Sequence, residues 1–326
     1  MKEFDYKYYL EMYEDLRHLT YEEAYSHYQD FGMNEGRICF PPCINIETNI
    51  TIILHLFNTN LFDEMKTYIY NVKKVFEIVN ILITINSNDF TGNIIHEFPN
   101  AIIIQVENKG TDNYPFLVCL QHIRRNNIKT DYILKLHTKE SSNNVENLFN
   151  WRQDLIKPII DYNNLIIIQH YFKTMTNIGY IGSQKCVMPK NYDFDFSHNI
   201  QGINELCDKF PHLEKEWTDF NGGNIFWISN DCLTEYLTED LIEYLKSNFL
   251  VGRKPPCNLS DKGIYVEYLC ERIFTGIFCY KKQNILVNEY SGTQRGISLT
   301  NGKIDDTYFY QPRIFSISVP QNIVTK

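Results

Sequence analysis

Apolar positions in residues 50–136 alternate between short apolar runs and longer stretches with helical periodicity. We expect runs rich in Ile, Leu and Val to form strands at 50–57, 79–85, 101–106 and 131–136. Amphipathic patterns predict a helix at 61–76 and another from about residue 114. Strands and helices in this order predict a doubly wound, mostly parallel α/β sheet with helices on both faces.

The second half of the chain has a less regular pattern that continues the same domain. Helices are expected at 150–162, 165–174 and 261–274, one or two helices at 231–249, and strands at 179–183, 219–229 and 278–287. No internal repeat is visible. We therefore treat residues 42–326 as one domain.

Residues 4–37 predict a separate unit of two short helices with an aromatic seam. Pro41 and Pro42 mark a linker, so the expected division is a helical accessory module at 1–41 and a larger domain at 42–326. A packing or docking module and a helical cap on the larger domain are equal alternatives. The positions at helical spacing are Tyr8, Tyr9, Tyr13 and Leu16, then Ala24, Tyr25 and Tyr28.

Composition narrows the class of protein. Hydrophobic residues make up 44% of the 326 residues, which predicts a packed core, and the net charge of -9 argues against non-specific nucleic-acid binding. Nine cysteines without a CxxC pair or zinc-finger spacing indicate reduced thiols in a cytoplasmic protein. We expect no signal peptide, and no apolar run approaches the roughly 20 residues of a membrane-spanning helix.

The end of the strand at 131–136 carries the most informative polar cluster. Lys135 interrupts an apolar run, and an unpaired buried ammonium is costly, so an anion must lie near it. His137, Thr138 and Lys139 follow at the carboxyl end, where open α/β sheets bind ligands. Together they favour an anionic ligand such as phosphate. The alternative is that Lys135 pairs with a neighbouring carboxylate and His137 is an ordinary strand-end residue.

A second candidate is the loop that follows the strand at 101–106. It contains Asn108, Lys109, Gly110 and Asp112, and it precedes a helix whose N-terminal amides could approach phosphate. Asp112 could accept hydrogen bonds from ribose or sugar hydroxyls. The loop is neither a Walker loop nor a GxGxxG fingerprint, and Asp and Asn also cap helices for structural reasons alone.

Two further groups lie in the second half. Asn221, Gly222 and Gly223 remove side chains at a strand entry, which fits either a tight turn or the close approach of a sugar ring. Glu267 and Glu271 share one helix face and could act as general bases. The other candidates are Arg272, for diphosphate binding or a carboxylate pair, and the DxD of Asp193 and Asp195, which we interpret as a solvated loop rather than a cation site.

Five stretches resemble, in order and spacing over residues 50–290, the signatures of the rhamnan synthesis protein F family of glycosyltransferases. These are VENKGTDNYPFL, YILKLHTKESS, Trp151-Arg152, NGGNIFWIS and EYLCERIF. Thr111 and Glu140 stand where that family usually has Arg and Lys, and NGGN varies a Gly-Thr-Met pattern. Residues 4–37 resemble a small aromatic module that accompanies many bacterial and giant-virus glycosyltransferases, which implies the host cytoplasm if the chain is viral.

The resemblance implies a nucleotide-sugar glycosyltransferase with a Rossmann-like, GT-A type domain, which transfers a hexose or a deoxyhexose such as rhamnose to a glycan acceptor. The donor would be a UDP-, dTDP- or GDP-sugar. Lys135, His137 and Lys139 take the place of the usual DxD, so we expect them to neutralise the leaving diphosphate without a protein-bound metal, with Mn²⁺ or Mg²⁺ the ions to test. The implied donor-binding residues are Asn108, Lys109, Gly110, Asp112, Lys135, His137, Thr138, Lys139, Asn221, Gly222, Gly223 and Arg272.

The resemblance also implies that Glu271, or else Glu267, takes the acceptor proton, and Glu271 matches the family motif better. The altered Thr111 and Glu140 support a competing hypothesis, a catalytically inactive scaffold that binds a glycan or a nucleotide sugar. A phosphate-ester enzyme is disfavoured because no Cys or Asp nucleophile motif accompanies the loop.

Overall fold

The structure is a computed structural model, and it describes most of the chain from residue 4 to residue 317. Of the candidate residues, Lys139, Glu140, Asp193 and Asp195 lie outside the described part. The described residues are 4–32, 35, 37, 39, 47–138, 151–175, 177–188, 196–217, 219–252 and 266–287, together with 298–300, 303–305 and 315–317.

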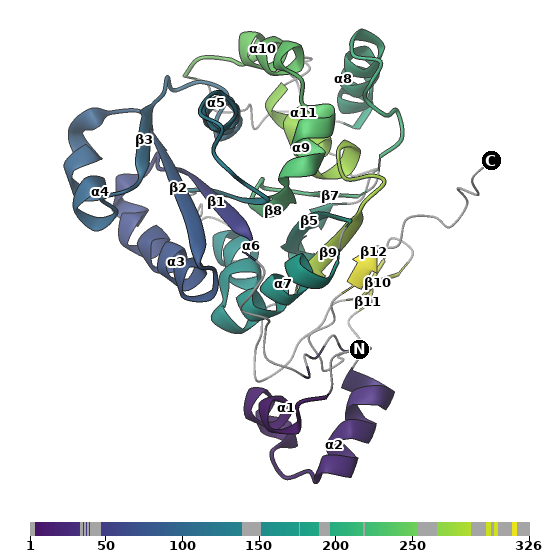
Figure 1. The fold of residues 1–326 in the computed structure, drawn as a ribbon. Coiled ribbons are helices and arrows are strands. Elements are labelled where there is room, and N and C mark those ends of the chain that lie inside the picture. The colour runs from purple at the N-terminus through teal and green to yellow at the C-terminus, as the bar shows by residue number, and fades with distance from the viewer. Residues whose placement is uncertain are drawn as a thin grey trace.

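An eight-stranded sheet in the order β12-β9-β5-β8-β4-β1-β2-β3 forms the centre of the molecule (Figure 1). β4, β1, β2 and β3 pair in parallel, as do β5 and β9, whereas β8 runs antiparallel to both of its neighbours and β12 runs antiparallel to β9. Two small antiparallel pairs, β6 with β7 and β10 with β11, lie outside this sheet. The strands are β1 (Asn49–His55), β2 (Ile78–Ile85), β3 (Ile102–Gln105), β4 (Tyr132–His137), β5 (Ile178–Ser183), β6 (Val187–Met188), β7 (Phe220–Asn221), β8 (Phe226–Ser229), β9 (Gln283–Val287), β10 (Ser298–Thr300), β11 (Lys303–Asp305) and β12 (Phe315–Ile317).

Helices cover both faces of the sheet, which confirms the predicted fold class (Figure 1). One face packs against α3 (Phe62–Val75), α4 (Thr91–Glu97), α6 (Trp151–Ile160) and α7 (Tyr162–Thr174). The other packs against α5 (Asn113–Arg125), α8 (Phe196–Lys209), α9 (Asn230–Tyr236), α10 (Glu239–Asn248) and α11 (Val266–Arg272). Short 3₁₀ and π segments are η1 (Glu14–Leu16), η2 (Tyr28–Gly32), η3 (Thr59–Leu61), η4 (Asn88–Phe90), η5 (Gln184–Cys186) and η6 (Ile273–Ile277).

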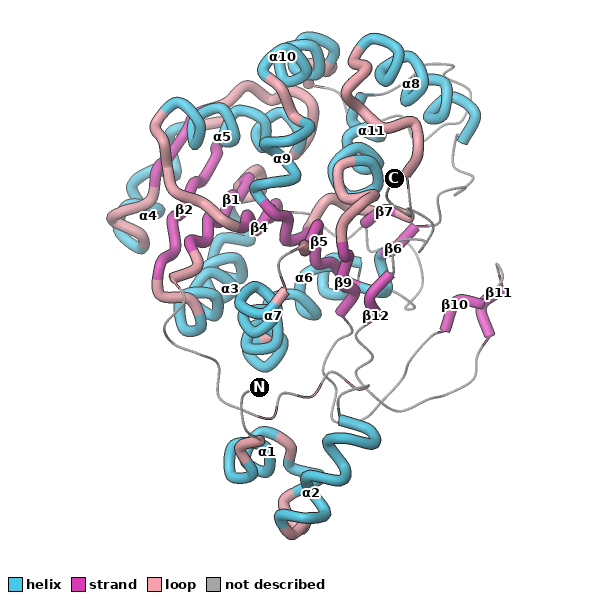
Figure 2. Tube along the Cα trace, turned by 45° about the vertical axis from the view of Figure 1, so that its right-hand side comes forward, coloured by secondary structure: helices cyan, strands magenta, loops and turns pink. Residues whose placement is uncertain are grey.

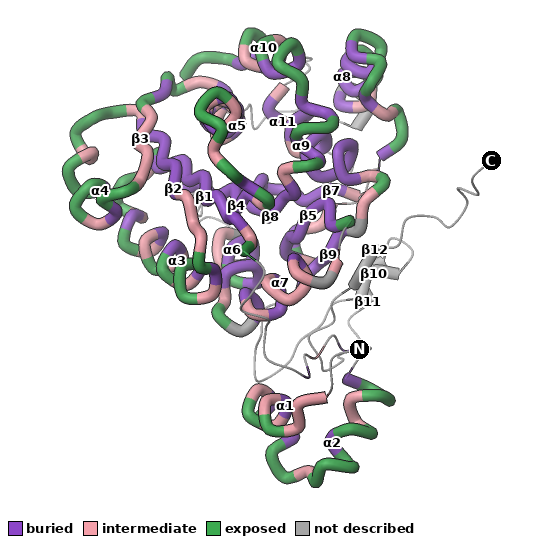
Figure 3. The backbone as a smooth tube through the Cα atoms, viewed as in Figure 1, coloured by how far each residue is buried: buried purple, intermediate pink, exposed green. Residues whose placement is uncertain are grey.

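The central strands are buried on both faces, which explains their nearly continuous apolar sequences (Figure 3). Along β4, Leu134 and Leu136 belong to the core shared with α3, α6 and α7, while Ile133 belongs to the core shared with α5 and α11. Because successive side chains point to opposite faces, Lys135 and His137 lie on the α5 side with Ile133. The strand therefore carries its polar groups to one face of the sheet.

Several elements differ from the sequence-based expectation. The expected strand at 219–229 is split into β7 and β8 because Gly223 and Asn224 adopt left-handed backbone conformations between them. Residues 231–249, where one or two helices are expected, contain two, and Thr238 caps the second. α4 and α8 were not predicted. In α4 only Ile94 is buried, so the sequence has no apolar stripe to reveal it.

The N-terminal module contains α1 (Tyr6–Met12) and α2 (Tyr21–His27), which lie side by side (Figure 2). The two helices pack around an aromatic core of their own. Tyr9, Tyr13 and Ala24 are buried there, whereas Tyr25 is 40% exposed and Tyr8 lies outside this core, so the expected seam is correct except at those two positions. Thr20 forms a capping box at the start of α2. We propose the division near residue 41 as the boundary between this module and the sheet domain.

Candidate functional site

The carboxyl ends of β1, β2 and β4 share one edge of the sheet because these strands are parallel. β8 is antiparallel to β4, so the turn before β8 reaches the same edge. The start of α5 and one face of α11 complete the cluster. This edge, here called the carboxyl edge, brings together Asp112, Lys135, His137, Asn224 and Glu271.

Lys135 forms a buried ion pair with Asp112. Its side chain is 1% exposed, and Nζ also donates to the backbone oxygen of Asn224 at 3.0 Å. The rings of Phe116 and Phe226 lie 5.4 and 5.8 Å from Nζ. The anion that Lys135 requires is thus an internal carboxylate, which agrees with the alternative interpretation of the sequence. In this arrangement the charge of Lys135 positions Asp112.

The remaining strand-end residues divide into a site residue and a structural one. His137 Nδ1 lies 3.7 Å from Asp112 Oδ2, and its side chain is 9% exposed. Thr138 Oγ1 instead accepts hydrogen bonds from the N–H groups of Phe57 and Asn58, at 3.0 and 2.9 Å. Thr138 thus fixes the end of β4 and does not present its hydroxyl to a ligand.

His55 at the end of β1 borders the same ion pair. Its Nδ1 lies 2.9 Å from Thr84 Oγ1, and burial lowers the pKa of the imidazole to about 4. The charge of Asp112 raises this pKa and the charge of Lys135 lowers it, so the two members of the ion pair oppose each other. His55 is therefore a neutral side chain at pH 7.

The loop before α5 has a strained backbone. Gly110 and Thr111 have φ of 58° and 53°, and a Cβ added at Gly110 would lie 2.5 Å from the ring of Phe249. Gly110 is thus required by both the conformation and the contact. Thr111 is β-branched and pays a conformational cost there, of about 1–3 kcal/mol. Strain of this kind is commonly retained at functional sites.

The start of α5 offers few amides to a phosphate. The N–H groups of Asn113 and Tyr114 both bond to Gly110 O, at 3.0 and 3.3 Å, and Pro115 has no N–H. This corrects the expectation that the helix N-terminus cradles phosphate, because its first-turn donors are already used or missing.

Lys109 supplies a cation at this loop that the ion pair does not neutralise. Its Nζ lies 5.6 Å from the centre of the Tyr114 ring, and the side chain is half-buried. It has no ion pair with any residue in the described part of the chain. Asn108 beside it is exposed, and its backbone oxygen accepts from the N–H of Gly252 at 2.7 Å. Lys109 is therefore better placed than Lys135 to meet an anionic ligand.

The first half of the turn between β7 and β8 serves packing. Asn221 is fully buried, and its N–H donates to Thr275 Oγ1 at 2.9 Å. The N–H of Gly222 donates to Cys186 O at 2.9 Å, and a Cβ at Gly222 would lie 2.8 Å from Met188. For these two positions the tight-turn interpretation accounts for the sequence, because the space is filled by the chain itself.

The second half of this turn forms hydrogen bonds with both charged groups of the site, the Asp112–Lys135 pair and Glu271. Gly223 and Asn224 have φ of 84° and 56°, and the N–H of Gly223 donates to Glu271 Oε1 at 3.3 Å. The backbone oxygen of Asn224 accepts from Lys135, and its Nδ2 donates to Asn113 Oδ1 at 3.0 Å. Two adjacent residues thus join the Asp112–Lys135 pair to the Glu271 carboxylate. Sequence reasoning missed Asn224, although an Asn after two glycines is a signal for left-handed backbone.

The other candidates on α11 face different surroundings. Glu267 is 7% exposed, and its Oε1 accepts from the N–H of Leu250 at 3.4 Å. Arg272 is 3% exposed, its guanidinium lies 4.4 Å above the Phe220 ring, and it donates to Tyr268 O. Arg272 is therefore buried against the core, and its role in diphosphate binding stays a prediction. Glu271 is the more exposed of the two carboxylates.

The described residues do not assemble a metal centre. Among them, no group of three or more His, Cys, Asp or Glu side chains is arranged to hold an ion. The carboxylate of Asp112, which would be the natural oxygen ligand, is already paired with Lys135. Within the same part of the chain, no helix combines the length and the apolarity needed to cross a bilayer.

The fold and this site define an α/β protein whose polar groups gather where such sheets bind ligands, at the carboxyl edge. The sequence pattern of the family described as rhamnan synthesis protein F matches residues 38–275, and the chain belongs to that family. The matched region includes the sheet strands from β1 to β8 and all of the carboxyl-edge residues. The resemblance inferred from the motifs is thus confirmed.

Among solved structures, the chain is similar to the mannosyltransferase PcManGT from Pyrobaculum calidifontis, solved in complex with GDP-Man and Mn²⁺. The identity is 15% and the TM-score 0.32, and the match covers 59% of this chain and 48% of that chain. The comparison with curated proteins finds none of similar sequence.

Proposed function

We propose that the chain is a nucleotide-sugar-dependent glycosyltransferase of GT-A type that transfers a hexose, or a deoxyhexose such as rhamnose, to a growing glycan. Membership of a polysaccharide-synthesis family supports the class of reaction. One observation carries the location of the site: Gly223 and Asn224 hold the Glu271 carboxylate and the Asp112–Lys135 pair at one edge of the sheet. Two fixed carboxylates with different surroundings suit a reaction that needs both a binding group and a base.

Asp112 is the binding group in this proposal. Lys135 keeps the carboxylate charged and fixes its direction, so Asp112 can accept hydrogen bonds from hydroxyls of the donor sugar or ribose. The orientation of Lys135 in turn depends on Asn224 O. The ion pair thus holds the Asp112 carboxylate in place before the donor binds, so that binding does not cost the entropy of ordering this side chain.

Glu271 is the proposed general base. One of its oxygens is held by the N–H of Gly223, and the side chain is partly exposed. It takes the proton from the acceptor hydroxyl as that oxygen bonds to the anomeric carbon, while the bond from this carbon to the diphosphate breaks. The diphosphate leaves with the bonding electron pair, and Lys109 and His137 offset its charge. A single displacement of this kind inverts the anomeric configuration.

The steps above are assigned to side chains of the chain alone. Mn²⁺ and Mg²⁺ are tested directly by assays with and without chelator. We place the reaction in the cytoplasm because the seven cysteines in the described part of the chain are buried free thiols.

The test is a transfer assay with purified full-length chain and a panel of UDP-, dTDP- and GDP-sugars. Products are detected by mass spectrometry, and donor binding is followed in parallel by thermal shift. We expect one donor class to stabilise the protein and to yield a glycosylated acceptor or, without acceptor, free sugar. Binding without any turnover would instead support the inactive scaffold, and no binding of any donor would refute both.

A further inference from the structure

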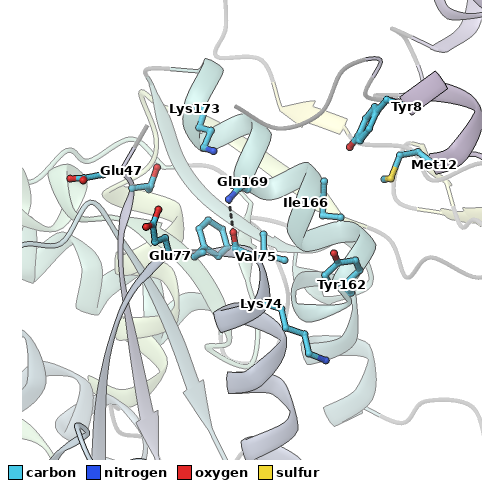
Figure 4. Close-up of a pocket in the computed structure, with 12 residues that line it drawn as sticks. Tyr8, Met12, Glu47, Lys74, Val75, Glu77, Tyr162, Ile166, Gln169 and Lys173 are labelled. Carbon is cyan, nitrogen blue, oxygen red and sulfur yellow. Dashed lines mark hydrogen bonds between the residues drawn. The ribbon is translucent and has the colours of Figure 1, made fainter. Parts of the chain in front are cut away.

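A cavity of about 380 Å³ lies at the amino ends of β1 and β2, at the opposite edge of the sheet from Asp112. Figure 4 shows the residues that line it. Its walls come from both parts of the molecule, α1 of the N-terminal module and α3 and α7 of the sheet domain. Its size is within the ~300–1,000 Å³ range of small-molecule sites. The residues that line the cavity include Tyr8, Met12, Lys74, Glu77, Ile166 and Tyr162.

Tyr8, on the α1 side of the cavity, carries a polar atom without a hydrogen-bond partner. Its hydroxyl oxygen is buried and has no hydrogen-bond partner in the described part of the chain. Burial, with Tyr162 and Asp5 nearby, raises the pKa of the phenol to about 12, so the group stays a neutral donor. Buried polar atoms are rarely left without a partner, and such an exception needs an explanation. A ligand hydroxyl in the cavity would provide it.

The rest of the lining indicates the chemistry of that ligand. Met12 and Tyr8 of α1 face Ile166 and Tyr162 of α7, which gives apolar surfaces and ring faces (Figure 4). The charged residues are balanced, with Lys74 and Lys173 against Glu47 and Glu77, so the cavity favours neither an anion nor a cation. A neutral molecule with apolar ring faces and a rim of hydroxyls fits this lining, and a sugar unit has that form.

We propose that the cavity between the N-terminal module and the sheet domain binds sugar units of a neutral glycan, as a second site remote from transfer. The choice of a glycan rests on the proposed function. The site would hold part of the growing chain at one edge of the sheet while its end is extended at the other. Because Tyr8 and Met12 come from α1, the module would form one wall of a glycan site.

The experiment measures binding of short rhamnan oligosaccharides to the full-length chain by calorimetry, with UDP and GDP titrated separately. Tyr8→Phe removes only the unpartnered hydroxyl, so we expect oligosaccharide binding about three- to tenfold weaker and unchanged thermal stability. Tyr162→Ala removes a ring that is 47% exposed and should weaken binding about tenfold. Nucleotide binding should be the same in both variants.

Two matched controls use aromatic residues of α2 outside the cavity. Tyr21→Phe and Tyr25→Ala change side chains that are 50% and 40% exposed and whose rings stack on each other. Both variants should bind oligosaccharide like the wild type. The proposal is overturned if wild type binds none of the oligosaccharides, or if Tyr25→Ala abolishes binding and Tyr162→Ala does not. Failure of nucleotide binding alone would count against the proposed function and not against this cavity.

Discussion

The two edges of the sheet are built in opposite ways. At the carboxyl edge, buried hydrogen bonds join Asp112, Lys135, Asn224 and Asn113. At the amino edge, the cavity is open to ligand and the hydroxyl of Tyr8 lacks a partner. The first region is organised before any ligand arrives, whereas the second is completed by one.

This difference predicts how each edge responds to substitution. A preorganised polar network loses much when one member is removed, because the others remain buried without partners. A cavity whose polar group is already unpartnered loses only ligand affinity. Substitutions at the carboxyl edge should therefore have the larger effects.

The largest effect should come from Glu271→Gln, which keeps the shape of the side chain and removes the base. We expect kcat to fall by about 10²–10⁴-fold with donor binding unchanged. Glu267→Gln is the control, since Glu267 is nearly buried, and it should stay within about tenfold of wild type. If Glu267→Gln causes the greater loss in kcat, the assignment of the two carboxylates must be exchanged.

Lys135→Met should destabilise the fold by about 3 kcal/mol or more, because it leaves Asp112 charged beside a low-dielectric core. Urea unfolding measures the change. Adding Asp112→Asn should restore part of the lost stability, which a purely additive pair of substitutions would not do. The control Lys281→Met breaks an exposed pair with Glu214 and should cost less than about 1 kcal/mol.

His55 gives the carboxyl edge a dependence on pH. Its folded-state pKa of about 4 lies below the unfolded value of 6.5, so the unfolded chain binds more protons between these values. Stability is then highest above pH 6.5 and falls on acidification, by about 2 kcal/mol from this residue between pH 7.5 and pH 5. Comparing urea unfolding of wild type and His55→Gln at both pH values isolates this contribution. Equal losses in the two proteins would show that His55 is not the source.

Lys109→Met should weaken donor binding by about tenfold without changing thermal stability, because the side chain has no ion pair in the described structure. The effect should shrink as salt is added. Lys129→Met is a matched control, since that exposed lysine precedes β4 at the other edge. A donor affinity unaffected by Lys109→Met would remove this residue from the site. The Tyr8→Phe effect on glycan binding at the amino edge should be similar or smaller.

The fold could be predicted from the sequence because β1, β2 and β4 are buried between two layers of helices and are therefore mostly apolar. The helix at 61–76 was equally clear, since Phe62, Met65, Ile69 and Val72 recur at helical spacing and are all buried. α4 gave no such signal. α8 was missed although Ile203, Leu206 and Cys207 recur at helical spacing and are buried, so a buried stripe favours the prediction of a helix without ensuring it.

Only part of the candidate site could be predicted from the sequence. The sequence placed Asp112, Lys135 and Glu271 among the candidates and required an anion near Lys135, but it could not show that Asp112 is that anion. Which partner neutralises a buried charge depends on contacts between residues 23 positions apart. The role of Asn224 was hidden for the same reason, because its backbone oxygen, and not its side chain, meets Lys135.

The central claim is that the carboxyl edge is the donor site, and a crystal structure with a bound nucleotide sugar tests it most directly. We predict the diphosphate within hydrogen-bond distance of Lys109 Nζ and a donor hydroxyl on the Asp112 carboxylate, with Lys135 still paired to Asp112. A donor seated in the cavity at the amino edge, or a diphosphate held by Lys135 with its pair to Asp112 broken, would contradict the account.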